Sequence, residues 1–469
     1  MLFSSIPFLY YFLPIVLLSY YLVPKSLKNG VLLAASLFFY GWGEIRYLFL
    51  MVALIIAAFF LAIFLESSKR RKKDGLTKVF LGFSLAVNIF TLGYFKYTDF
   101  FISSFNQVTG LSLPLLRLVL PIGISFYVFQ LMSYLVDVYR GEVRVQKNLL
   151  LLAAYVSMFP QLIAGPIVRY STIEEQLGER EINLSGIAWG IRRFLLGLGK
   201  KVILANTLGE CCEGFKETSE KTVLFFWVYA AAFMLHIYFD FSGYSDMAIG
   251  LGKMLGFSFP ENFCYPYTAK SITEFWRRWH ISLGTWFRDY VYIPLGGNRV
   301  GKARWIFNLL VVWFLTGFWH GAAWNFIVWG LYFAVFLVLE KLWLHSWLKR
   351  WKIFAHLYVI LTVAVSFIIF DAATLQEAAS NIKGLLGMGS DGAWSVESLY
   401  YLRSYGQILC IATVGATPLP AFWIKKIRNY RRGEQLLGIM EPLVLAMLLL
   451  AATAYLVDGS FNPFLYFRF

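Results

Sequence analysis

Charged residues are scarce in this sequence. Asp, Glu, Lys and Arg together make up only 15% of its 469 residues, whereas hydrophobic residues make up 59% and aromatic residues 19%. Soluble globular domains carry roughly 25% charged residues. The low charged fraction therefore excludes a water-soluble globule and indicates a polytopic membrane protein.

Cysteine is also rare. The four cysteines are Cys211, Cys212, Cys264 and Cys410, and none of them belongs to a CxxC pair. Without such spacing the sequence offers neither a disulfide framework nor a zinc site, so no bound metal is expected.

The chain lacks any Pro/Ser-rich or low-complexity linker, and we expect a single membrane domain over residues 1–469. The N-terminal run MLFSSIPFLYYFLPIVLLSYYLVP has neither a basic n-region nor a small-residue cleavage site. It is therefore expected to be a retained first membrane helix rather than a signal peptide.

The net charge of +15 comes from short basic blocks between apolar runs, not from a continuous basic face. Such blocks follow the positive-inside rule, so they indicate membrane topology and lipid contact rather than nucleic-acid binding. The polar, slightly acidic stretch 371–403 is expected outside, and so is the N-terminus. The blocks expected in the cytoplasm are residues 69–73, 140–147, 299–304, 349–352 and 425–432.

The apolar segments predict an all-α fold with about eleven or twelve transmembrane helices, each near the roughly 20 residues that a bilayer requires. Residues 149–201 do not fit a clean crossing, because Gly165, Pro166 and the polar stretch 171–183 interrupt them. A broken or re-entrant segment is expected there. Irregular backbone survives at membrane depth only inside protein or beside a water-filled cavity, so a cavity is expected nearby.

Two of the five histidines lie in aromatic surroundings, and the first is His280. If residues 274–290 form one helix, its charged residues lie largely opposite an apolar face. An interfacial helix with an aromatic belt explains Trp276 and Arg278 but not His280, whose imidazole then faces the protein interior. The apolar face holds Trp276, Trp279, His280, Leu283, Trp286 and Phe287.

His320 lies in the motif TGFWHG, between an apolar run over residues 305–319 and another over residues 322–339. The two runs predict a hairpin whose turn carries His320. A lone buried histidine is more often a satisfied core residue than a functional one. Ionisable groups at membrane depth are nevertheless functional by default, and the flanking glycines open space for a substrate. A neutral imidazole there is suited to act as a general base.

A third constellation runs from His236 to Asp246 and places two carboxylates and four hydroxyl groups within or at the edge of an apolar segment. His236 and Asp240 are four residues apart and can meet on one helix face. These residues either line a polar path or tie neighbouring helices together, and the sequence leaves both interpretations open. Asn262 lies in a proline-flanked loop, where it is placed to cap or orient a neighbouring helix.

Several long motifs occur in the second half of the chain. They are YFDFSGYSDMAIGLGKMLGF (238–257), NF (262–263), PY (266–267), EFWRRWHISLGTWFRDYVYIPLGGNR (274–299), TGFWHG (316–321) and the closing FNPFLYFRF (461–469). These motifs resemble those of the membrane-bound O-acyltransferase family, and most closely those of its alginate O-acetyltransferase branch. The resemblance covers most of the chain and is densest over residues 238–329.

The resemblance implies tilted helices and re-entrant or interfacial helices around a central tunnel, with a catalytic core over about residues 120–345. It implies that His320 is the catalytic residue and His280 its partner. We expect His320 to be the base and His280 to orient or hydrogen-bond the acyl carbonyl. Candidates to line the tunnel are Trp276, Trp279, Trp319, Asp240, Tyr244, Asp246 and Asn262.

The resemblance also implies acetyl-CoA as a donor co-substrate that binds from the cytoplasmic side, with no bound cofactor. Its phosphates need cationic partners, for which Arg277 and Arg278 are the candidates. The implied function is O-acetylation of an extracytoplasmic polysaccharide at the bacterial cytoplasmic membrane. The acceptor hydroxyl can belong to the polysaccharide or to an extracellular esterase-like acetyltransferase partner protein.

Two other functions remain possible on the sequence alone. The D-alanyl branch, which modifies teichoic acid, shares the FWxRWH and WHG patterns, but PLGGNR at residues 294–299 favours acetylation. A proton-coupled lipid or oligosaccharide flippase could instead use the histidines and aspartates as a proton relay. Transporters usually show paired halves, and no such repeat is visible here.

Overall fold

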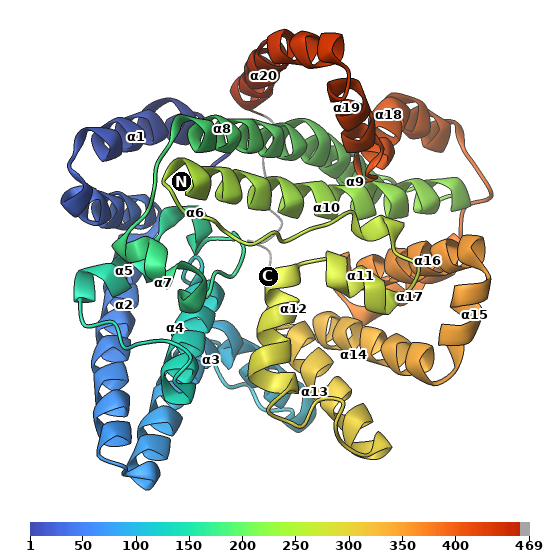
Figure 1. The fold of residues 1–469 in the computed structure, drawn as a ribbon. Coiled ribbons are helices and arrows are strands. Elements are labelled where there is room, and N and C mark those ends of the chain that lie inside the picture. Colours follow the sequence, from blue (N-terminus) through green and yellow to red (C-terminus); the bar gives the residue numbers. More distant parts are fainter. Residues whose placement is uncertain (460–469) are drawn as a thin grey trace. The chain divides into compact units, whose positions relative to one another are not determined.

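The computed structural model describes residues 1–459, and every regular element within them is a helix (Figure 1). This confirms the all-α prediction. The closing motif FNPFLYFRF lies outside the described residues. Contacts divide the chain into two compact units, Met1–Phe194 with Met247–Pro260 and Leu195–Asp246 with Glu261–Phe469. That all of it serves one catalytic domain stays a prediction.

The first unit is built around the long helix α2, which packs against α3, α4 and α5. Ring contacts among Phe3, Phe8, Phe39 and Phe159 form part of its core. The helices of this unit are η1 (Phe8–Phe12), α1 (Leu13–Leu22), η2 (Lys25–Leu27), α2 (Lys28–Arg70), α3 (Asp74–Thr109), α4 (Ile124–Arg140), α5 (Leu149–Ser157), α6 (Phe159–Leu162), α7 (Tyr170–Gly178) and most of α8 (Leu184–Gly199).

The interrupted segment after residue 149 is confirmed, because α5, α6 and α7 are short helices rather than one crossing. Pro160 has no backbone N–H with which to continue α5 and lies in the first turn of α6, where a missing donor is tolerated, and Pro166 lies in the irregular stretch between α6 and α7. Buried backbone groups find side-chain partners instead. The N–H of Phe159 donates to Ser36 Oγ at 3.1 Å, and Gln161 Nε2 donates to the Tyr155 carbonyl at 2.6 Å.

The second unit holds all of the candidate site residues named from the sequence. Its helices are η3 (Lys200–Ala205), α9 (Asn206–Glu217), most of α10 (Val223–Met254), η4 (Pro266–Thr268), α11 (Ile272–Arg278), α12 (Ile281–Phe287), η5 (Arg288–Tyr292), α13 (Lys302–His320), α14 (Trp324–Leu339), η6 (Glu340–Leu344), α15 (His345–Arg350), α16 (Lys352–Asp371), α17 (Leu375–Leu385), α18 (Val396–Gly415), α19 (Leu419–Arg428) and α20 (Arg431–Asp458).

The hairpin predicted around His320 is confirmed, since α13 ends at His320 and packs against α14. Two glycines allow this close approach. A Cβ atom on Gly317 would overlap the carbonyl of Phe326, and a Cβ atom on Gly330 would overlap the carbonyl of Trp313. The glycine pair therefore sets the distance between the two helices near the end that carries His320.

Six helices in residues 1–459 are long and apolar enough to cross a membrane, or seven if the bent pair α18–α19 forms one span. The chain is thus a multi-pass membrane protein, with fewer such helices than the eleven or twelve expected. The difference arises in part because some apolar runs fold as short helices, including α1 and α5, and because residues 28–70 form one long helix, α2. Hydropathy alone does not reveal where a run is broken.

Gly330→Ala tests the close packing of α13 against α14. The added methyl group should push the helices apart and destabilise the protein by about 1–3 kcal/mol, as overpacked cores do. We expect a lower Tm in detergent by intrinsic fluorescence. The matched control is Gly406→Ala in α18, where a Cβ atom meets nothing within 4 Å, and it should leave Tm unchanged or slightly raised. Equal Tm values for both variants would contradict the packing argument.

Candidate active site

His280 lies at a break between two short helices. The sequence suggested one helix over residues 274–290, but α11 ends at Arg278 and α12 begins at Ile281. His280 adopts a left-handed conformation with φ of 45° and ψ of 52°, which is uncommon for a residue other than glycine. Five of the six residues of the expected apolar face are buried nonetheless, including Trp279, His280 and Trp286, and Trp276 is half-buried.

Asn262 holds this break in place. Its backbone carbonyl accepts from the N–H of Ile281 at 3.0 Å. Its side-chain oxygen accepts from the N–H of Ser282 at 3.2 Å and from Ser282 Oγ at 2.9 Å, and it lies 3.2 Å from His280 Nδ1. Asn262 Nδ2 donates to Ser245 Oγ at 3.1 Å. Asn262 therefore caps α12 and contacts His280, as the sequence suggested for a capping or orienting residue.

Aromatic rings surround the His280 imidazole. Their centroids lie 6.3 Å away for Phe241, 6.3 Å for Phe263 and 6.2 Å for Trp319. Burial in this apolar shell lowers the pKa of His280 to about 3, because a charged imidazolium would lose its hydration there. His280 lies outside the helices that could span the membrane. Its imidazole is thus neutral throughout the physiological pH range.

His320 is the last residue of α13 and is only 7% exposed. Its imidazole centroid lies 5.1 Å from Trp319, 5.0 Å from Trp329 and 5.4 Å from Phe370. The Trp319 indole thus lies beside both imidazoles. His280 and His320 are 40 positions apart in sequence. The fold places the His280 imidazole beside Trp319, the residue that directly precedes His320.

The other tryptophan candidates belong to two aromatic clusters. Trp276 packs against Trp313, Trp329 and Phe333, with centroids 4.7, 5.6 and 4.8 Å away. Trp279 stacks on Phe275 at 5.5 Å. Trp276 therefore joins α11 to the α13–α14 hairpin. That these tryptophans line a tunnel stays a prediction.

The aspartates of α10 form ion pairs with the π-helical segment η3. Lys201 Nζ lies 2.6 Å from Asp240 Oδ1 and Lys200 Nζ lies 2.7 Å from Asp246 Oδ2. Meanwhile His236 Nδ1 lies 2.7 Å from the carbonyl of Ala205. Both pairs connect neighbouring helices, as the tie interpretation expects. A tunnel-lining role for Asp240, Asp246 and the buried Tyr244 stays a prediction.

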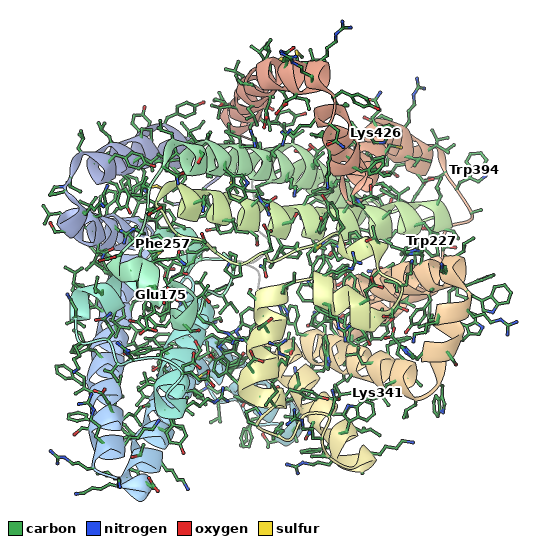
Figure 2. The ribbon with its side chains drawn as sticks, viewed as in Figure 1. Glu175, Trp227, Phe257, Lys341, Trp394 and Lys426 are labelled. Carbon is green, nitrogen blue, oxygen red and sulfur yellow. The ribbon has the colours of Figure 1, made fainter. Side chains whose placement is uncertain are left out.

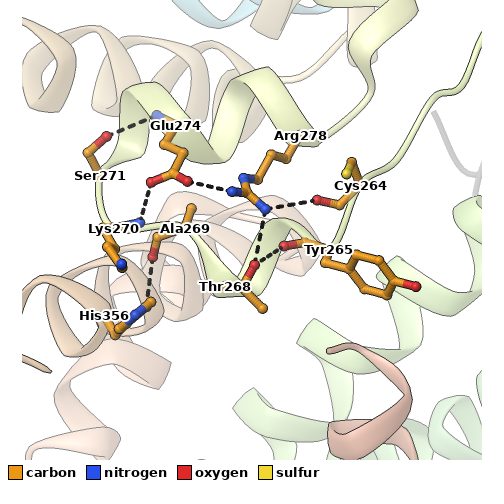
Figure 3. Close-up of polar contacts among 9 residues, drawn as sticks. All are labelled: Cys264, Tyr265, Thr268, Ala269, Lys270, Ser271, Glu274, Arg278 and His356. Carbon is orange, nitrogen blue, oxygen red and sulfur yellow. Dashed lines mark hydrogen bonds and ion pairs between the residues drawn. The ribbon is translucent and has the colours of Figure 1, made fainter. Parts of the chain in front are cut away.

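The two arginines of α11 differ in their surroundings. Arg278 is held by Glu274, Thr268 and the Cys264 carbonyl, with its Nη2 atom 2.6 Å from Glu274 Oε1 (Figure 3). Burial raises the pKa of Glu274, but hydrogen bonds from the Lys270 N–H and Arg278 outweigh it and leave the pKa below its usual value. Arg278 is accordingly a structural residue in this conformation.

Arg277 instead lines a pocket of about 900 Å³. The pocket has apolar walls as well as a cluster of basic side chains. Lys341 (Figure 2), one of these, donates to Asn298 Oδ1 at 3.0 Å and lies over the Trp305 ring. The polar residues around the pocket are Lys270, Ser271, Thr273, Glu274, Arg277, Tyr292, Asn298, Glu340, Lys341, His345, Lys349 and Lys352.

Both acidic residues of this pocket are occupied by structural contacts. Glu274 accepts from Arg278 and from the N–H of Lys270. The buried Glu340 accepts from the N–H groups of Ile272 and Thr273 at the start of α11, and from Thr273 Oγ1 at 2.7 Å. The two carboxylates of the pocket thus already accept hydrogen bonds from protein groups, whereas five Lys and Arg side chains line the pocket.

Three residues of this region were not predicted from the sequence: Ser282, Trp329 and Glu340. Ser282 and Trp329 lie within the dense motif region but carry no signal of their own. Glu340 was detectable, because it is an isolated acid after a long apolar run, where an ionisable side chain is costly unless it has partners. Among residues 1–459, no group of three His, Cys, Asp or Glu side chains is arranged to hold a metal ion.

The long apolar helices and the enclosed imidazoles define a multi-pass membrane protein with a buried histidine site. Residues 35–376 match the model of the membrane-bound O-acyltransferase family. The chain belongs to this family and is a membrane-bound acyltransferase. The resemblance noted in the sequence is thereby confirmed.

Individual relatives cover the chain to different extents. It is 37% identical to a probable alginate O-acetylase of Pseudomonas putida over 490 residues, which span 100% of both chains. It is 32% identical to a peptidoglycan O-acetyltransferase of Helicobacter pylori over 518 residues, which span 100% of this chain and 98% of the relative. It is 30% identical to a teichoic acid D-alanyltransferase of Bacillus subtilis over 243 residues, which span 49% of this chain and 61% of the relative.

Proposed function

We propose that this chain transfers an acetyl group from acetyl-CoA at the cytoplasmic face to a hydroxyl group, for the O-acetylation of an extracytoplasmic polysaccharide. The observation that carries the proposal is the placement of two buried histidines beside one indole, Trp319, within the motifs that resemble the family. The full-length relatives named O-acetylase and O-acetyltransferase support acetyl transfer.

Transfer requires a base for the attacking hydroxyl and a donor for the oxyanion that forms on the thioester carbonyl. We assign the base to His320. The buried indole N–H of Trp329, 5.0 Å away between ring centroids, has no hydrogen-bond partner among residues 1–459. A buried donor without a partner is costly and is often explained by function. We assign Trp329 as an oxyanion donor.

The phosphates of the donor are assigned to the basic pocket, with Arg277 as one of their ligands. Arg277 lines the pocket, whereas Arg278 is already held by Glu274 and Thr268. Both acids of the pocket have protein partners, so its free charge is positive and suits an anion. The pocket also contains Lys349 and Lys352, from a block that the positive-inside rule assigns to the cytoplasm.

The hydroxyl that accepts the acetyl group is assigned to the extracytoplasmic face of the membrane. The hydroxyl belongs either to the polysaccharide or to an extracellular esterase-like partner protein that passes the acetyl group on. In this arrangement the protein lies in the bacterial cytoplasmic membrane with its N-terminus outside, as its basic blocks predict. No cofactor is bound permanently, because acetyl-CoA is consumed as a co-substrate.

D-alanyl transfer to teichoic acid is less well supported. The D-alanyltransferase relative matches only 49% of this chain, whereas the O-acetylase and O-acetyltransferase relatives match all of it. PLGGNR also contributes Asn298 to the basic pocket, beside Lys341. A flippase is disfavoured because the family model of acyltransferases covers residues 35–376.

His320→Gln tests the assigned base, because an amide keeps polarity and approximate size but cannot take a proton near pH 7. In inverted membrane vesicles given radiolabelled acetyl-CoA, we expect label in lumenal polymer or protein to fall by roughly 10²–10⁴-fold. The control is His356→Gln, since His356 Nδ1 contacts the Ala269 carbonyl and glutamine can still donate there. Wild-type labelling in His320→Gln would refute the base assignment.

The two arginines give a matched test of donor binding. Arg277→Gln should raise the KM for acetyl-CoA by about 10-fold with little change in kcat, because a charged hydrogen bond to phosphate is lost. Arg278→Gln should mainly lower Tm, since its partners Glu274 and Thr268 are structural. An increase in KM for Arg278→Gln alone would contradict the assignment of the pocket.

A further inference from the structure

We infer that Asn262 is a positioning residue that fixes His280 in the tautomer protonated on Nδ1, so that His280 Nε2 accepts a hydrogen bond from a substrate O–H or N–H group. This inference rests on the proposed function for its substrate. It differs from one of the two roles expected from the sequence, a hydrogen bond from His280 to the acyl carbonyl, because that bond requires a proton on the outward nitrogen.

The neighbours of Asn262 define the orientation of its side-chain amide. The backbone N–H of Ser282 lies 3.2 Å from Asn262 Oδ1, and a backbone N–H group can only donate. The amide atom facing it must therefore be the oxygen and not the nitrogen. The contact between Asn262 Nδ2 and Ser245 Oγ at 3.1 Å agrees, because a hydroxyl oxygen can accept there.

The tautomer of His280 follows from this orientation. His280 Nδ1 lies 3.2 Å from the same Asn262 Oδ1 atom. An amide oxygen only accepts, so Nδ1 must carry the proton. A neutral imidazole holds a single N–H, which leaves a lone pair on Nε2. His280 therefore presents an acceptor, and not a donor, on the side of the ring away from Asn262.

The surroundings keep the imidazole neutral. The rings packed around it are Phe241 of α10, Phe263 of the loop after α10 and Trp319 of α13, and the side chain in polar contact with it is Asn262. None of these side chains titrates. The pKa of His280, lowered to about 3 by burial, agrees with a neutral ring whose single proton is held by Asn262.

The backbone explains why the interaction is rigid. His280 has φ of 45°, and Asn262 holds the two residues after it through the N–H groups of Ile281 and Ser282. The His280 imidazole and the Asn262 oxygen that accepts from it are thus both held by the backbone of residues 280–282. Rotation of the ring would break the contact at Nδ1 and leave a buried amide oxygen with fewer donors, which is unfavourable.

Two substitutions at Asn262 separate this role from simple packing. In Asn262→Asp, a carboxylate can keep all of the acceptor contacts, and Ser245 can rotate its hydroxyl to donate. The negative charge should raise the pKa of His280. Activity should then fall as the pH drops through the raised pKa, because protonated Nε2 no longer accepts. In Asn262→Leu the tautomer is no longer fixed.

The experiment measures kcat/KM for acetyl transfer against pH in the vesicle assay. We expect Asn262→Asp to retain activity at high pH and to show its acid limb at higher pH than the wild type. Asn262→Leu should lose activity on the order of 100-fold. Ser282→Ala, which removes one hydroxyl donor to Asn262 Oδ1 but keeps the backbone N–H, should cause a smaller loss with an unshifted profile.

The outcomes distinguish this inference from the proposed function. If the wild type transfers acetyl groups and the acid limb of Asn262→Asp coincides with that of the wild type, the inference is wrong while the proposed function stands. Full activity of Asn262→Leu would also overturn it. If the wild type transfers no acetyl group, the proposed function itself fails. Tm measurements identify a variant that has lost its fold. If Asn262→Leu does not fold, the pH profile of Asn262→Asp decides the question.

Discussion

The convergence of hydrogen bonds on Asn262 is the constraint on which the rest of the site depends. A buried imidazole needs a partner for its N–H, and a short helix needs acceptors for its first N–H groups. Asn262 meets both needs, through its side-chain oxygen for His280 and Ser282 and its carbonyl for Ile281. One residue of an irregular loop thereby fixes both the backbone break and the chemistry of the ring.

The elements around this break are held by contacts that are distant in sequence. Glu340 caps the start of α11 from a position 68 residues away, and the Trp276 ring joins α11 to the α13–α14 hairpin. The close approach of Gly317 and Gly330 fixes that hairpin. His280 consequently lies beside the Trp319 indole, the chain neighbour of His320, because separate parts of the chain pack together.

The sequence predicted the all-α fold, the hairpin ending at His320 and the buried face of residues 274–290, because hydropathy and periodicity report burial directly. It did not predict the break at His280, since tertiary contacts hold that backbone, from Asn262 to Ile281 and Ser282 and from Cys264 to Arg278. Nor could it separate Arg277 from Arg278, which are adjacent and chemically identical. Their difference depends on Glu274 and Thr268, whose positions are set by folding.

On the proposed function, the reacting carbonyl of the donor lies beside His320 and Trp329 while its phosphates occupy the basic pocket. An experimental structure with a ketone analogue of acetyl-CoA, in which a methylene group separates sulfur from the carbonyl, tests this most directly. We expect the ketone oxygen within about 4 Å of Trp329 Nε1, with the phosphates beside Arg277. Analogue bound elsewhere, with its ketone remote from both imidazoles, would contradict it.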